Sequence, residues 1–518
     1  MRHRHYLILL ILWISESLSA QRILYSPAIN GRAGERFSIA GKVGEYYWIQ
    51  KEQQKQRIPR QAEEWMRQEQ FFEIYDARLQ LQRSVPAAAI TASTLKKYMV
   101  CGNRYFDEVI LSAGDRRTNV QVRRYAANGW LQADTLIASF AFNEPGYSFI
   151  LSVSADKNKI LLLAFESVPA SAPRLHSMVF DGNWHSISSL VFDQPFITQP
   201  FIQDDFFSFP STVSSAPVQI ANSGGWLMAS PSRTSNNFLF LHFDGTSGNI
   251  DYKDIVLPAL YKMEDIALSL NNEKGEALVG ILSRYRQTAH KNVRVTHFSF
   301  SGNAFDFDSS YRFSTLAGFQ SNNTNLVRES FVAVPNRGFM LLKEYGRTFT
   351  SWYNQDNYDR PWDPEFLFAS TVTTHTPQGF LFTNNGYSRY STSVAVADNY
   401  SRGDLSIFYF PGCAADSSWS GFVNKKQITE LNAPSLSYLF VPLQNKLVFM
   451  YNSSDRDDCP FGSTLVLDPG GYQLAEKELI TWEADQSLLF QEALQITPNE
   501  VALPYERDRQ KGFAIVRF

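Results

Sequence analysis

The 518-residue sequence has little of what marks nucleic-acid-binding or membrane-spanning proteins. Charged residues make up only 19% of the chain, and 48 basic against 51 acidic residues leave a formal net charge of −3. Such a balance gives no basic field that would attract a nucleic acid. Beyond the N-terminal segment, no uninterrupted apolar run approaches the roughly 20 residues of a transmembrane helix. We therefore expect neither a nucleic-acid partner nor a transmembrane helix.

Cysteine is also scarce, with three residues in the whole chain. Cys413 and Cys459 lie in polar, turn-rich segments, whereas Cys101 follows an apolar run. In an oxidising compartment a Cys413–Cys459 disulfide is the better pairing, and three free thiols are the alternative. No Cys or His spacing matches a zinc site, and no nucleophile elbow, Walker loop or dinucleotide fingerprint occurs. The sequence therefore assigns no catalytic residue and no metal ligand of these classes.

The first twenty residues form a separate unit. A basic start precedes the apolar run 6–14, which is too short to span a bilayer, and small residues follow at positions 17–20. This pattern is typical of a secretory signal peptide cleaved after Ala20. We therefore expect an exported protein, periplasmic or extracellular and associated with the cell surface, whose mature chain covers residues 21–518.

Helical periodicity is almost absent from the mature chain. Short runs such as Lys159 to Phe165 are rich in apolar, β-branched and aromatic residues and are bounded by turn-forming residues, which predicts buried strands. The exception is the polar segment 51–70, whose Gln-, Glu- and Arg-rich second half carries Trp65 and Met66. We interpret it as a surface insertion that is either helical or a loop. The fold class is therefore all-β.

The strands repeat at a regular interval. The segments 119–129 and 292–302 share Asn, two Val, an aromatic residue and a final Gly at the same offsets, and 237–245 is a shorter copy. Including the segments that start at Leu175 and Leu465, the turn glycines stand at positions 129, 182, 245, 302 and 470. A period of roughly 50 to 60 residues with several strands per unit is typical of radial blades.

A second series sets the number of blades. Nine segments pair a turn residue with an apolar strand, beginning at Gly44, Asp107, Asn158, Gly225, Gly275, Gly338, Gly379, Asn445 and Asn499. Since propellers usually have four to eight blades, we predict a single β-propeller of about eight four-stranded blades, within a range of seven to nine. Pairing of the N-terminal strand with the C-terminal strand would close the ring. An outer-membrane β-barrel is a further alternative, suggested by the terminal Phe518.

The most distinctive local segment runs from Trp352 to Glu365. It combines aromatic rings with carboxylates and has two prolines, which predicts a loop. Flat rings beside carboxylates can stack on sugars or peptides and accept their hydrogen bonds. The alternative is a connecting loop whose rings fold back onto the core. The candidate ligand-binding residues are Trp352, Tyr353, Asp356, Tyr358, Asp359, Trp362 and Asp363, with Tyr387 and Arg389 from a neighbouring segment.

One acidic run is a candidate cation site. Asp455, Asp457 and Asp458 supply the hard oxygen donors that calcium prefers, although their spacing does not match an EF-hand loop. A solvated acidic turn is the alternative interpretation. The sequence indicates no other cofactor.

Two functions from different classes follow from these observations. The first is an exported, non-catalytic binding or scaffold protein that recognises a glycan, a peptide or another protein. The second is a secreted enzyme built from loops, a glycan hydrolase or lyase, with Asp356, Asp359 or Asp363 as acid and base. Two carboxyl groups that converge across one cleft would favour the enzyme.

Overall fold

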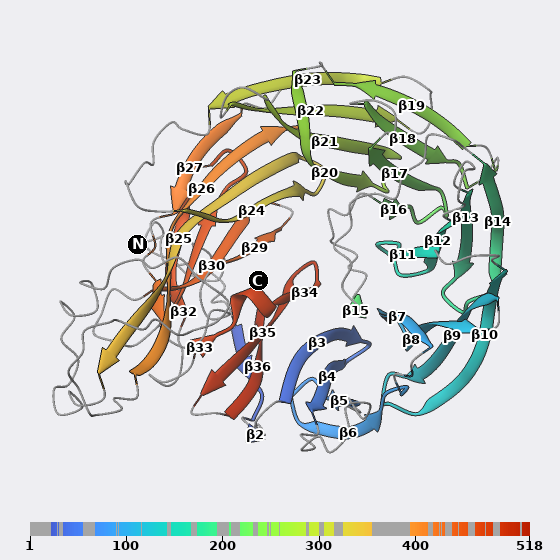
Figure 1. Cartoon of the computed structure of the whole chain (residues 1–518), viewed down its shortest axis with the longest axis horizontal. Coiled ribbons are helices and arrows are strands. Elements are labelled where there is room, and N and C mark those ends of the chain that lie inside the picture. Colours follow the sequence, from blue (N-terminus) through green and yellow to red (C-terminus); the bar gives the residue numbers. More distant parts are fainter. Residues whose placement is uncertain are drawn as a thin grey trace, which may run out of the picture.

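In the computed structural model the described chain is almost entirely β-strand, and its strands form eight separate sheets arranged in a ring (Figure 1). The predicted β-propeller is therefore confirmed, with eight blades. The structure describes residues 22–30, 35–54, 68–114, 116–141, 147–166, 174–193, 207–208, 218–231, 237–257, 260–285, 290–299, 305–314, 325–354, 394–412, 418–429, 438–453, 461–479, 487–507 and 510–518, apart from positions 28, 90, 92, 246, 247, 249, 424, 426, 444 and 472.

The first four blades follow one another along the chain, and each is an antiparallel meander of four strands. Blade 2 has an additional short strand, β15 (Phe207–Ser208), which pairs in parallel with its innermost strand. Blade 1 contains β3 (Glu35–Val43), β4 (Tyr46–Gln54), β5 (Gln68–Tyr75) and β6 (Leu81–Pro86), and blade 2 contains β7 (Thr94–Cys101), β8 (Tyr105–Gly114), β9 (Arg117–Ala126) and β10 (Leu131–Ala141). Blade 3 contains β11 (Tyr147–Val153), β12 (Lys159–Glu166), β13 (Arg174–Asp181) and β14 (Ser186–Asp193). Blade 4 contains β16 (Val218–Ile220), β17 (Trp226–Pro231), β18 (Asn237–Phe243) and β19 (Ile250–Val256).

Blades 5 to 7 continue the same pattern, and blade 6 has an additional strand β28 (Gln427–Thr429) on its third strand. Blade 5 contains β20 (Tyr261–Asn271), β21 (Glu276–Tyr285), β22 (His290–Ser299) and β23 (Phe305–Ser314). Blade 6 contains β24 (Asn325–Val334), β25 (Gly338–Asn354), β26 (Val394–Pro411) and β27 (Trp419–Val423). Blade 7 contains β29 (Tyr438–Pro442), β30 (Leu447–Ser453), β31 (Phe461–Leu467) and β32 (Gln473–Leu479).

Blade 8 is built from both ends of the chain. It contains β33 (Ser487–Leu488), the short 3-10 helix η3 (Phe490–Glu492), β34 (Leu494–Thr497), β35 (Glu500–Arg507) and β36 (Gln510–Arg517), together with β1 (Arg22–Tyr25) and β2 (Ile29–Asn30). Strand β1 pairs with β36, from Arg22 opposite Arg517 to Tyr25 opposite Ala514. The predicted closure of the ring is confirmed. The barrel alternative is wrong for the described residues, because a barrel is one closed sheet and these strands form eight.

Both repeat series correspond to strand positions. Each described member of the second series enters the second strand of a blade, which gives β4, β8, β12, β17, β21, β25, β30 and β35. The ninth member, at Gly379, lies outside the described residues. The members of the first series coincide with third strands, namely β9, β13, β18, β22 and β31. The eight blades therefore follow the turn-plus-strand unit of the sequence.

Eight hydrophobic clusters fill the eight interfaces between neighbouring blades. Between blades 1 and 2, for example, the rings of Trp48 and Phe106 stack with their centroids 4.2 Å apart. Inner strands such as β12 are buried on both faces, which explains why their sequences are apolar without alternation. The core is therefore a ring of contacts between sheets, and each blade depends on both neighbours.

The ends of the polar segment 51–70 are strand residues. Lys51 to Gln54 belong to β4, and Gln68 to Gln70 belong to β5. The predicted insertion therefore includes strand residues at both of its ends, because the register of β4 with β5 runs from Tyr47 opposite Tyr75 to Gln54 opposite Gln68. Residues 55–67, which include Trp65 and Met66, lie outside the described residues.

The two faces of the ring differ. We call the face with the first-to-second and third-to-fourth strand turns the turn face, and the opposite face the loop face. Turns of blades 1 and 3 share one motif, in which Asp76 and Asp181 each accept two backbone N–H bonds. In these turns the left-handed residue is Leu79 or Trp184, and the turn glycine Gly182 does not adopt that conformation.

Candidate functional site

The structure places two of the nine sequence-predicted ligand-binding residues, at the end of one hairpin. Trp352 and Tyr353 lie just before Asn354, the last residue of β25, and they pair with Val396 and Ala395 of β26. Asp356, Tyr358, Asp359, Trp362, Asp363, Tyr387 and Arg389 lie outside the described residues. All of them belong to the connection 355–393 between β25 and β26, so one connection carries both sequence segments. The distances between their carboxyl groups are not defined, and the hydrolase stays a prediction.

This hairpin extends beyond its blade on the loop face. Strands β25 and β26 have 17 and 18 residues, while each neighbouring strand of blade 6 has ten or fewer (Figure 1). Pairing of β24 with β25 ends at Gly346, and β28 pairs with β26 only over Tyr400 to Arg402. We call residues 347–354 with 394–399 the arm. Over this length the two described strands pair with each other.

A cluster of charged side chains lies near the base of the arm, between blades 5 and 6. The ammonium group of Lys291 on β22 contacts the carboxylates of Glu264 on β20 and Glu329 on β24. Glu329 also contacts Lys343 on β25 at 3.1 Å, and Arg284 reaches Glu264 at 3.1 Å. Alternating charges therefore connect β20, β21, β22 and β24 to β25, the strand that continues into the arm. No local motif indicates this cluster, because its members come from five separate strands.

Burial and charge oppose each other at Glu329. Burial acts to raise the pKa of its carboxyl, but the ammonium groups of Lys291 and Lys343 outweigh this effect and hold the pKa below its ordinary value. For Lys343, burial and the nearby Lys291 outweigh the carboxylates and lower the pKa of its ammonium group. Each charge in the cluster therefore depends on a neighbour of opposite charge to offset the cost of its burial.

A second ion pair fixes the same part of blade 6. Glu344, the residue after Lys343, contacts the ammonium group of Lys425, and both side chains are fully buried. Lys425 lies between β27 and β28, and its ammonium group is 5.9 Å from the centre of the Tyr438 ring in blade 7. Since a buried charge is costly without its partner, this pair ties β25 to the segment that connects the two outer strands.

The turn face is joined from blade to blade by hydrogen bonds between successive inner turns. Asn103 donates to the backbone oxygen of Asp156 at 2.8 Å, and the Asp156 amide donates to the Asn222 side chain at 3.2 Å. The Asn222 amide donates to Asn272 at 2.8 Å. Arg337 similarly donates to Asn445 of the next blade at 3.3 Å. These bonds couple the turns of blades 2 to 5 and of blades 6 and 7.

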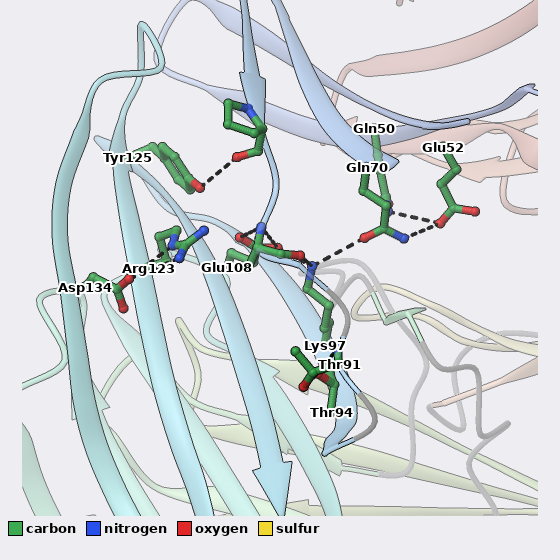
Figure 2. A network of polar contacts seen from close by, with 12 residues as sticks. Gln50, Glu52, Gln70, Thr91, Thr94, Lys97, Glu108, Arg123, Tyr125 and Asp134 are labelled. Atoms are coloured by element: carbon green, nitrogen blue, oxygen red, sulfur yellow. Dashed lines mark hydrogen bonds and ion pairs between the residues drawn. The ribbon is translucent and has the colours of Figure 1, made fainter. Parts of the chain in front are cut away.

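Figure 2 shows a further polar network, which spans blades 1 and 2. The ammonium group of Lys97 contacts Glu108 and donates to the backbone oxygen of Ala88 at 2.8 Å. Glu108 in turn accepts the Ala88 amide at 2.9 Å, and Gln70 of blade 1 lies 3.4 Å from the Lys97 ammonium group. The side chains of Lys97 and Glu108 are 2% and 0% exposed. Because the network encloses the connection between the two blades, we assign it to stability rather than to ligand binding.

The remaining candidate positions concern metal binding, a disulfide and three histidines. Among the described residues there is no group of three or more His, Cys, Asp or Glu side chains placed to hold a metal ion. Asp455, Asp457 and Asp458 lie outside these residues, as do Cys413 and Cys459, so calcium and the disulfide both stay predictions. Burial raises the pKa of the Cys101 thiol to about 12. The histidines at 176, 242 and 297 stand on the equivalent third strands β13, β18 and β22, which favours a structural position for them.

Comparison with known proteins gives likeness in fold alone. No protein-family model matches the sequence, and no curated protein sequence matches it. Similar solved structures include the WD40 domain of SCAP from fission yeast, with 8% identity, a TM-score of 0.40, and coverage of 96% of this chain and 94% of that one. A eukaryotic initiation factor matches with 11% identity, a TM-score of 0.32, and coverage of 86% and 96%. The fold assignment therefore rests on the strand pairing of this chain.

None of the helices in the described part of the chain has the length and apolar character needed to cross a bilayer.

Proposed function

We propose that this chain is an exported, non-catalytic binding scaffold that recognises a glycan, peptide or protein partner through the connection at the tip of the arm. The observation that carries the proposal is the extension of β25 and β26 past the other strands of blade 6. The described hydrophobic contacts of blade 6 with its neighbours come from residues 339–342 of β25 and 405–410 of β26, at the opposite end of the hairpin from this connection.

The residues in this connection have the chemistry of a recognition surface. Its sequence combines tryptophan and tyrosine rings with carboxylates, which suits stacking on a sugar ring or a peptide group together with hydrogen bonding. The charged cluster around Lys291 and Glu329 supports the proposal, because a fixed base lowers the entropy that binding must overcome.

The test shortens the arm connection without touching the blade. Residues 355–393 are replaced by Asn-Gly, which joins the paired residues Asn354 and Val394 through a two-residue hairpin turn. Wild type and variant are then screened on a glycan array and against a random-peptide phage library. We expect the variant to keep its melting temperature and to lose the ligands selected by the wild type. Equal binding by the variant, or no ligand for the wild type, would overturn the proposal.

A point variant provides the matched comparison. Trp352→Ala with Trp362→Ala removes two rings but leaves the length of the connection unchanged. Each lost ring is expected to weaken binding by about 1 to 3 kcal/mol. A large fall in melting temperature would instead show that the rings belong to the core, since deleting a buried Trp costs about 3 to 5 kcal/mol.

A further inference from the structure

The outer strand of blade 2, β10, is the longest of the outer strands that carry at most one charge. Among the described strands, each outer strand of a blade has one edge without a neighbour in the sheet, and proteins usually protect such edges with charged residues or proline. Strand β19 carries Asp251, Lys253 and Asp254, and β32 carries a similar run of three charges. Strand β10 has 11 residues, the sequence LQADTLIASFA, and a single charge at Asp134. That charge is itself neutralised by Arg123 at 3.2 Å.

Apolar side chains on and beside β10 are exposed. Leu131 is 54% exposed, Leu136 is 58% exposed, and Trp130 in the turn before the strand is 57% exposed. The guanidinium group of Arg83 on the neighbouring β6 lies 3.6 Å from the centre of the Trp130 ring. Trp and Arg are residue types enriched in binding hot spots, and here one of each lies beside the start of β10.

The register of β10 limits what can pair with its outer edge. Register shifts between Leu131 and Ala133 and between Leu136 and Ala138 interrupt its ladder with β9. Between them, Ala133 to Leu136 form a regular window of the ladder. Bulges twist an edge away from a long, flat partner strand, such as the same strand of a second copy, while a short peptide fits between them.

The charges at the two ends of β10 define the partner further. Arg83 lies beside the turn that precedes the strand, and the exposed Arg116 and Arg117 lie at its far end, where Arg117 pairs with Ala141. Positive charge at both ends complements a segment with carboxylates near its ends. The alternating N–H and C=O groups of a strand edge are recognised by another extended backbone.

We propose that the outer edge of β10 binds a short extended segment of a partner protein by strand addition. This segment has apolar residues at alternate positions and Asp or Glu near both ends. The site is separate from the arm of blade 6, so it is an additional interaction surface on the scaffold.

The probe is a fluorescein-labelled peptide of alternating valine and threonine with two glutamates at each end. Its binding to the full chain is measured by fluorescence anisotropy. One control peptide has lysines in place of the glutamates, and the other has N-methylated valines, which cannot complete a strand ladder. We expect the glutamate peptide to bind at least about tenfold more tightly than either control, a difference of about 1.4 kcal/mol. Equal binding of the three peptides, or no binding of the glutamate peptide, would overturn the proposal.

Variants locate the site. Leu136→Lys places a charge in the regular window of β10 and is expected to weaken binding about tenfold. Val256→Lys, at a 61% exposed position on the charged strand β19, is the matched control and is expected to leave binding within about twofold. Arg117→Glu should weaken the glutamate peptide and strengthen the lysine peptide. A loss of the same size in both lysine variants would contradict the assignment to β10.

Amide hydrogen exchange distinguishes strand addition from nonspecific binding to the surface. Strand addition should slow the exchange of amides in residues 131–141 on adding the glutamate peptide. The variant with a shortened arm should bind this peptide like the wild type, which separates this proposal from the proposed function. Protection elsewhere, with none in β10, would overturn it.

Discussion

The hydroxyl of Tyr505 donates a 2.7 Å hydrogen bond to the backbone oxygen of Ser26, and so joins the last hairpin of the chain to its first strand. Ser26 is held twice more, because its amide donates to the Phe513 oxygen at 2.9 Å and its hydroxyl accepts the Phe513 amide at 3.0 Å. The closure of the ring therefore rests on specific polar contacts as well as on the pairing of β1 with β36.

The packing of Tyr505 against Gly512 predicts that the cost of a side chain at position 512 depends on the residue at position 505. A Cβ added at Gly512 would lie 2.5 to 2.7 Å from atoms of the Tyr505 ring. We expect Gly512→Ala to lower the free energy of unfolding by about 1 to 3 kcal/mol in the wild type, and by much less in a Tyr505→Leu background where the ring is gone. Urea denaturation measures both. Gly421→Ala, where the nearest atom would be 3.8 Å away, is the control, and an equal cost in both backgrounds would contradict the explanation.

The buried pair of Lys97 and Glu108 predicts non-additive losses. Lys97→Met or Glu108→Gln alone leaves one group buried without its charged partner, and we expect a cost of about 3 to 5 kcal/mol for each. The double variant removes both charges, and its glutamine can still accept the Ala88 amide, so its cost should be less than the sum. Arg123→Met, which breaks a more exposed pair, should cost about 0 to 1 kcal/mol. Strict additivity in urea denaturation would refute this account.

The lowered pKa of Glu329 predicts that the charged cluster near the arm contributes less to the unfolding free energy in acid. A carboxyl whose pKa is lower in the folded state contributes stability above its unfolded pKa, near 4.5, and this contribution is lost as pH falls through the lower, folded value. We therefore expect the difference in unfolding free energy between wild type and Glu329→Gln to be constant at neutral pH and to shrink below about pH 4.5. Urea unfolding at several pH values measures it. A difference that is unchanged down to pH 2 would show that Glu329 is not the group involved.

Export predicts a defined mature terminus. When the chain is expressed with its own leader in a secretion-competent host, N-terminal sequencing should find Gln21 as the first residue. A variant with Leu9→Arg and Leu10→Arg interrupts the apolar run and should stay uncleaved inside the cell. Recovery of the wild type with Met1 still attached would disprove the interpretation of residues 1–20 as a signal peptide.

Most of the blade architecture was predictable from the sequence, because each second strand begins with its own local signal. Gly44, Asn158 or Gly275 ends a turn and an apolar run follows, so the unit that repeats in the sequence is also the unit that repeats in space. Closure was predictable for a related reason, since two strand-like ends in a radial repeat remove two exposed edges by pairing. The left-handed position in blade 3 was not, because Trp184 adopts it and the sequence offered Gly182 nearby.

The candidate sites were less predictable. The aromatic connection drew attention as a local run of rings and carboxylates, but nothing local indicated that β25 and β26 extend past their blade. The surface at β10 depends on the short neighbouring strand β6 and on bulges, which arise from register rather than from composition. The charged cluster at Glu329 combines side chains from five strands. Properties of this kind arise only when distant segments come together.

The construction of blade 8 from both chain ends has a consequence for how the protein is made. Residues 510–517 are synthesised after all the other described strands, and β36 pairs on one side with β35 and on the other with β1 and β2. Until that strand is synthesised, the apolar sides of blades 1 and 7 that face blade 8 stay in water. Assembly of the ring is therefore a step that follows the synthesis of β36, and a chain cut short before this strand would be a substrate for chaperones and proteases.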